Sequence, residues 1–138
     1  MLGVVIFSFL FSGFASRVFL PELLKPFDVQ QASAAWYSSS WSYRETVTID
    51  YTKVSGTAAL ADFPVLVAAT TTAWKHTSFS GHVGIASGTD ILFTSSDGTT
   101  KLSHEIEKYS SSTGELVAWV KVPTLSTTTD TTLYMYYG

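Results

Sequence analysis

The sequence contains no cysteine, so neither disulfide bonds nor thiolate metal ligands are available to it. Charged residues make up only 14% of the chain, and lysine and arginine form no run. With a formal net charge of -3 the chain lacks a basic surface for a polyanion, which argues against nucleic acid as a partner. No glycine-rich phosphate loop and no GxSxG nucleophile motif occurs, so we expect no cofactor.

The chain also lacks a long uncharged apolar run. Its longest is LGVVIFSFLFSGFAS, residues 2–16, and a helix that spans a membrane needs roughly 20 apolar residues. The run is followed at 32–35 by ASAA, which has the small-x-small spacing of a signal-peptidase site. We interpret residues 1–35 as an export signal that is cut after Ala34 or Ala35. The alternative is an N-terminal membrane segment in which residues 2–24 stay uncleaved.

Residues 36–138 consist of short segments with a two-residue apolar period, separated by glycine, serine, aspartate and proline clusters. This pattern predicts an all-β domain, an antiparallel β-sandwich of about seven strands, with a small closed barrel as the alternative. We expect 63–70 to be buried on both faces and 82–87 to be the weakest strand. The expected strands cover residues 43–51, 63–70, 82–87, 89–94, 101–109, 115–122 and 131–138.

The strongest local signal is TSSDGTT at 94–100, because Asp97 and Gly98 suit a type I′ turn between two alternating runs. A two-residue loop predicts that Phe93 faces Leu102 and that residue 91 faces residue 104. A three-residue loop with a left-handed Gly98 would shift this register by one position. We prefer the first register, because it keeps the apolar side chains on one side of the hairpin.

Five blocks carry a resemblance to a known family when they are taken in order. They are WYSSSWSYRETVTID, DFPVLV, DILFTSSDGTTKLSHEIE, VAWVKVPTLS and DTTLYMYYG. Over residues 36–138 the chain resembles the domain-of-unknown-function family DUF2341, and it departs from the family pattern at Leu92, Ser95 and His104. The resemblance implies an exported or surface-attached module that precedes concanavalin-A-like or laminin-G-like domains. It also implies that the chain is the N-terminal fragment of a longer protein, and it supplies no catalytic residues.

Catalytic and metal-binding interpretations find little support in the sequence. Glu105 and Glu107 have a spacing that a glycosidase pair could use, but a solvated strand face explains them more simply. His76, His82 and His104 have no metal-ligand spacing, so we predict no metal site. We expect no enzyme activity.

The aromatic residues are the most unusual chemical resource of the chain, because flat rings stack on sugars. We predict Trp36, Trp41 and Trp74, which fall in loops, as ligand-binding residues. Trp119 and Tyr43 are interpreted as core or sheet-covering residues, and Trp36 with Trp41 as a cap where the chain enters the sandwich.

These observations predict a non-catalytic, exported or cell-surface module that is a structural, adhesive or carbohydrate-interacting part of a larger protein. Its expected partners are a glycan or surface protein and downstream domains of the same chain. One alternative is an accessory domain of a polysaccharide-active hydrolase. The other is a membrane-tethered envelope component with an uncleaved N-terminal helix.

Overall fold

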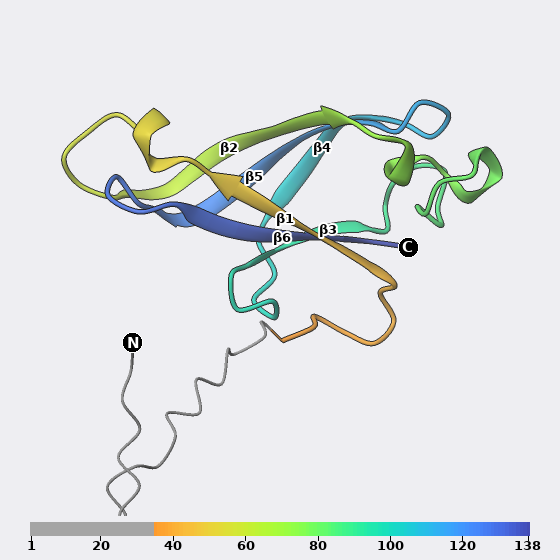
Figure 1. Cartoon of the computed structure of the whole chain (residues 1–138), viewed down its shortest axis with the longest axis horizontal. Coiled ribbons are helices and arrows are strands. Elements are labelled where there is room, and N and C mark those ends of the chain that lie inside the picture. The colour runs from red at the N-terminus through yellow and green to blue at the C-terminus, as the bar shows by residue number, and fades with distance from the viewer. Residues whose placement is uncertain (1–34) are drawn as a thin grey trace, which may run out of the picture. The chain divides into compact units, whose positions relative to one another are not determined.

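Two three-stranded antiparallel sheets carry the alternating apolar side chains of the sequence (Figure 1). The computed structural model describes residues 35–138, so all of the expected leader except Ala35 lies outside the described residues. One sheet has the order β1-β6-β3 and the other the order β2-β5-β4. The strands are β1 (Tyr43–Ile49), β2 (Leu60–Thr70), β3 (Ile91–Ser95), β4 (His104–Ser110), β5 (Glu115–Leu125) and β6 (Thr131–Tyr137).

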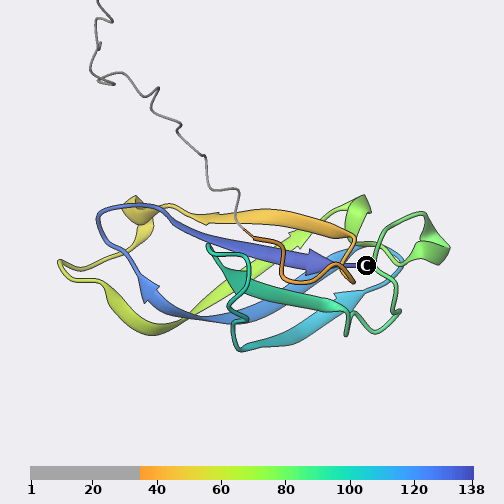
Figure 2. The same cartoon turned by 90° about the horizontal axis from the view of Figure 1, so that it is seen from below.

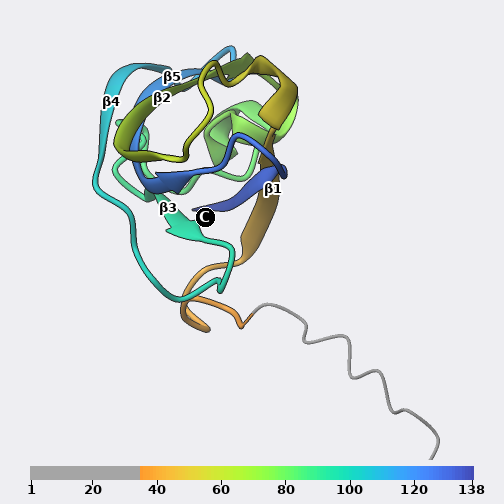
Figure 3. The same ribbon diagram turned by 90° about the vertical axis from the view of Figure 1, so that its left-hand side faces the viewer.

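The apolar core lies between the two sheets, which form two layers when the molecule is viewed along them (Figure 3). The alternation is clearest in β5, which buries four alternate residues in this layer and leaves the residues between them on the outer side. The confirmed fold is therefore an antiparallel β-sandwich. The largest fully buried core side chains include Phe93, Leu116, Leu133, Met135, Val120 and Val122.

The predicted strand at 82–87 is wrong, and the described sandwich has six strands. The segment belongs to a loop with two short 3-10 helices, η2 (Thr72–Trp74) and η3 (Thr77–Phe79). Val83 is buried in the core and forms one isolated bridge with His76. The chain bends directly after it, because the carboxylate of Asp90 accepts hydrogen bonds from the backbone N–H groups of Gly84 and Ile85.

The prediction that residues 63–70 are buried on both faces is also wrong. They belong to β2, which among the described strands is an edge strand beside β5, and most of its side chains are exposed. Val67 points into the core, whereas 47% of Leu66 remains exposed. Tyr51 was expected at the end of the strand over residues 43–51, but β1 ends at Ile49 and Tyr51 begins another 3-10 helix, η1 (Tyr51–Lys53).

The hairpin register predicted around Asp97 is confirmed at its tip. Thr94 bridges Lys101, and the backbone N–H of Leu102 donates to the carbonyl of Phe93 over 2.8 Å. The predicted type I′ turn is wrong, because Gly98 alone of the two turn residues has a positive φ, at 76°. Beyond this point the two strands separate, and β3 and β4 join different sheets, so the turn forms a corner of the sandwich (Figure 2).

Within the described residues, we find no helix that has both the length and the apolar character needed to cross a membrane.

Candidate functional site

An arginine surrounded by aromatic rings holds the first described residues against the β1-β6-β3 sheet. The guanidinium carbon of Arg44 lies 4.7 Å from the ring centre of Trp36 and 4.4 Å from that of Tyr134. These separations are typical of cation–π contacts. The indole N–H of Trp36 donates to the carbonyl of Trp41 over 2.9 Å, which closes the loop on itself. Contacts within the domain therefore occupy one face of the Trp36 ring and its indole N–H.

The hydroxyl of Tyr136 is the centre of a hydrogen-bond network under this cluster. The residue is fully buried, and its hydroxyl donates to the carbonyl of Gly98 over 3.1 Å. The same oxygen accepts from the backbone N–H of Tyr37 and from Nη1 of Arg44, each over 3.3 Å. The N-terminal segment (residues 35–41) therefore runs beside the β3–β4 turn, as Figures 1 and 3 also show.

A second aromatic site lies on the outer side of the β2-β5-β4 sheet. Trp119 of β5 is 42% exposed, and its register partners are Leu66 on β2 and Glu105 on β4. Its indole N–H donates to Oε2 of Glu107 over 2.8 Å, so a neighbouring strand orients the ring. We call this surface the Trp119 face; it consists of Pro64, Leu66, Glu105, Glu107, Trp119 and Lys121.

Beside the Trp119 ring, the Trp119 face has a shallow hollow and an ion pair. The hollow has a volume of about 290 Å³ and is lined by Pro64, Ser103, His104, Glu105, Trp119 and Lys121. Nζ of Lys121 lies 3.1 Å from the carboxylate of Asp62, so both signs of charge occur at one edge. The face can therefore offer an apolar plane, hydrogen-bond donors and acceptors together.

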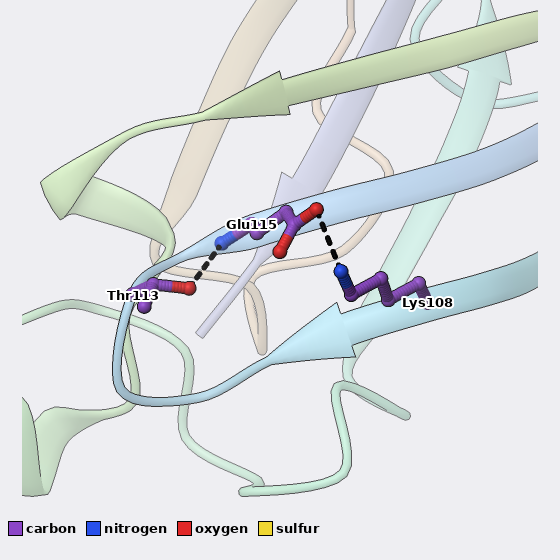
Figure 4. Close-up of polar contacts among 3 residues, drawn as sticks. All are labelled: Lys108, Thr113 and Glu115. Carbon is purple, nitrogen blue, oxygen red and sulfur yellow. Dashed lines mark hydrogen bonds and ion pairs between the residues drawn. The ribbon is translucent and has the colours of Figure 1, made fainter.

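The β4–β5 hairpin fixes the strands that carry this face (Figure 4). Nζ of Lys108 lies 2.9 Å from Oε1 of Glu115, and the backbone N–H of Glu115 donates to the hydroxyl of Thr113 over 3.3 Å. The register shifts between Ile106 and Lys108, so Glu107 is the extra residue of a bulge. A bulge re-aims its side chain, and here the side chain reaches the indole of Trp119.

Comparison with known proteins identifies the second half of this sandwich. Residues 87–138 match the family described as Domain of unknown function (DUF2341). The match confirms the family resemblance for β3 to β6, which include Tyr136, Glu105 and Trp119. No curated protein and no solved structure matches the chain.

Two of the three positions that were expected to depart from the DUF2341 pattern make structural contacts in the fold. Leu92 is the register partner of Tyr136 and is 4% exposed. The ring nitrogens of His104 lie 3.1 Å from the carbonyl oxygen of Leu102 and 3.2 Å from that of Ile91. His104 therefore links the two strands where they separate into different sheets.

The three tryptophans predicted as ligand-binding residues lie in different environments. Trp36 is 42% exposed, and Trp41 is half-buried with its ring 6.5 Å from that of Tyr37. Trp74 corrects the prediction, because its side chain is only 6% exposed and packs in the core. Its loop folds back over the end of the sandwich, where its carbonyl accepts from the hydroxyl of Tyr109 over 2.7 Å. Trp74 cannot stack on a ligand from this position.

The exposure of Trp119 was not predicted from the sequence. Trp119 alternates with Ala118 and Val120, both fully buried, and shares its side of β5 with Lys121. The exposed lysine was the available signal for which side faces water. Tyr43, the other residue interpreted as core or sheet-covering, is 38% exposed and stacks between His82 and Tyr137.

Tyr137 is a buried polar residue at the end of β6. Its hydroxyl donates to Oε1 of Glu45 over 2.7 Å, and its side chain is 3% exposed. Burial, together with the adjacent carboxylate of Glu45, raises the pKa of Tyr137 far above its usual value. The carboxylate of Glu45 thus points inward from the edge strand β1, where it accepts this hydrogen bond.

The three histidines serve separate structural contacts. Nδ1 of His76 accepts from the N–H of Ser78 and caps η3, His82 stacks on Tyr43, and the ring of His104 lies between the backbone carbonyls of Leu102 and Ile91. Across residues 35–138, no group of three histidine, aspartate or glutamate side chains is arranged to hold a metal ion.

Proposed function

We propose that this domain is a non-catalytic module of an exported or cell-surface protein and that it holds a glycan against the Trp119 face. The observation that carries the proposal is an exposed indole whose own N–H is held by Glu107 on the neighbouring strand. A ring oriented before binding loses little conformational entropy when a ligand stacks on it. As part of a larger protein, the module serves adhesion to carbohydrate.

The chemistry of the face favours a sugar ring as the ligand. A pyranose has an apolar side that stacks on an indole and hydroxyl groups around its edge. Leu66 extends the apolar plane on one side of Trp119, and Glu105 offers a carboxylate on the other. The hollow beside Trp119 adds the polar side chains of Ser103 and Lys121 at its rim.

The charges on the face favour a neutral glycan. Lys121 is paired with Asp62, and both glutamates of the face add negative charge. An acidic polysaccharide would meet carboxylates without a free basic partner, which costs binding energy. A neutral chain exchanges hydrogen bonds with the same groups without that cost.

A second hollow of about 450 Å³ lies between η1 and β2, and it is a weaker candidate for a glycan site. Its lining is largely apolar, with Leu60, Phe63 and Leu125 among the contributing side chains. Sugars need polar partners for their hydroxyl groups, and Lys53 and Ser55 are the polar side chains that this hollow offers.

Affinity electrophoresis tests the proposal directly. The protein is run through gels that contain hydroxyethylcellulose, galactomannan or, as an acidic comparison, polygalacturonate. Wild type should be retarded by a neutral polysaccharide, and Trp119→Ala should weaken this binding at least tenfold, about 1.4 kcal/mol.

Two variants separate this site from the N-terminal cluster. Glu107→Gln keeps an acceptor oxygen for the indole and should still be retarded, and Trp36→Ala should lose stability but keep its binding. Loss of retardation in Trp36→Ala with normal retardation in Trp119→Ala would assign the glycan to the N-terminal cluster instead. The absence of retardation by all three polysaccharides would argue for a structural role.

A further inference from the structure

The sequence allows two positions for removal of the leader, and they differ by one residue. Cleavage after Ala34 uses Ala32 and Ala34 as the small residues of the site, whereas cleavage after Ala35 uses Ser33 and Ala35. Sequence alone does not choose between them. The contacts that Ala35 makes in the folded domain favour one of them.

The carbonyl oxygen of Ala35 is bound by the sandwich. It accepts from Nη1 of Arg44 over 3.2 Å, and the hydroxyl of Tyr136 lies 3.4 Å from it. The hydrogen bond from a guanidinium is charge-assisted and is therefore stronger than one between neutral groups.

Gly98 shows how closely this carbonyl packs. A Cβ atom at Gly98 would collide with the carbonyl oxygen of Ala35, so only glycine leaves room for it. Gly98 also has a φ of 76°, which glycine adopts without strain. The β3–β4 turn therefore packs directly against the carbonyl of Ala35.

We propose that the mature chain begins at Ala35, after a leader peptidase hydrolyses the peptide bond between Ala34 and Ala35. Water is the second reactant: its oxygen forms the new carboxylate of Ala34, and the α-amino group of Ala35 leaves as an ammonium. This inference rests on the proposed export of the chain. Ala35 keeps its carbonyl, so the contacts with Arg44 and Tyr136 survive.

Cleavage one residue later would remove Ala35 together with the leader. Arg44 would then lose the carbonyl of Ala35 as an acceptor, and the turn at Gly98 would lose the residue that packs against it.

The first test is the N-terminus of the exported protein, measured by intact mass and N-terminal sequencing. Ala35 as the first residue supports the inference, and an exported chain with any other first residue overturns it. A chain that remains uncut in the cytoplasm would contradict export itself. Ala34→Leu should stop cleavage at this bond, and the matched Ala35→Leu should leave it unchanged, because residue 35 then follows the cut.

The second test does not require export. Purified chains that begin at Ser33, Ala35 and Trp36 are compared by thermal unfolding. The first two should melt together, and the chain from Trp36 should melt about 4–8 °C lower, the shift expected for loss of one good hydrogen bond in a domain of this size. Equal melting temperatures for all three would overturn the physical reason for the inference.

Discussion

Replacing Tyr136 with phenylalanine tests the hydrogen-bond network that joins the N-terminal segment to the sheet. The ring keeps its packing, because only the hydroxyl is deleted. The buried carbonyl of Gly98 loses its donor, and the N–H of Tyr37 loses its acceptor. An unsatisfied buried group costs about 1–3 kcal/mol. Arg44 keeps the carbonyl of Ala35 as an acceptor, so we expect a total loss of about 2–3 kcal/mol.

Urea unfolding at equilibrium measures this loss. A domain of this size has a slope of about 1–3 kcal/mol per molar urea, so the midpoint should fall by about 1–2 M with the slope unchanged. Tyr134→Phe is the matched control: its ring also lies against Arg44, and within residues 35–138 its hydroxyl makes no hydrogen bond. The control should change stability by less than about 0.5 kcal/mol. Equal midpoints for the two variants would refute the role assigned to the Tyr136 hydroxyl.

Three further predictions concern the core and the β3–β4 turn. Val120→Ala should cost about 2–3 kcal/mol in urea unfolding, whereas Val117→Ala on the outer side of the same strand should cost much less, and similar losses would contradict the assigned faces. Gly98→Ala should lower the melting temperature and cost at least about 1–2 kcal/mol, because it strains a left-handed residue and displaces Ala35; an unchanged melting temperature would contradict this packing. Hydrogen bonds from the side chain of Thr100 and from the backbone hold the pKa of Asp97 well below its usual range. The stability from its carboxylate is therefore complete above about pH 4 and is lost as the pH falls through the folded-state pKa. Asp97→Asn should be less stable than wild type at pH 6, with a gap that narrows below about pH 4; a gap independent of pH would refute this.

The two-residue period located five of the six described strands, because a strand with one buried and one solvated side has alternating apolar and polar residues. The continuous apolar run located β2. The two-residue pattern predicted a wrong strand at 82–87, where the apolar signal depended largely on one buried residue. Val83 is buried from a loop, and a single apolar side chain does not distinguish a loop that reaches the core from a short strand. The burial predicted for β2 was wrong for a different reason: its continuous apolar run indicated a strand covered on both faces, but most of its side chains are exposed in the described domain.

The hairpin around Asp97 has one feature that neighbouring residues determine and one that distant residues determine. The register at Thr94 and Lys101 follows from turn chemistry, which neighbouring residues decide. The departure of β3 and β4 into different sheets depends on partners that are distant in the sequence: β3 pairs with β6, and β4 pairs with β5. The sequence around the turn therefore does not predict which strands β3 and β4 pair with.

The tryptophans show why a candidate site was harder to predict than the fold. All are large aromatic residues, but their roles depend on what holds the indole N–H and covers the ring. In Trp36 the N–H bonds the chain's own backbone and Arg44 covers one face, so the ring closes the entry of the domain. In Trp119 the N–H is bound by Glu107 from the neighbouring strand, which orients the ring while 42% of the side chain remains exposed. Glu107 lies two residues beyond Glu105, the register partner of Trp119, so both glutamates lie on the same side of the sheet as the ring. A ring that is both oriented and exposed is suited to binding, and sequence alternation alone reveals neither property.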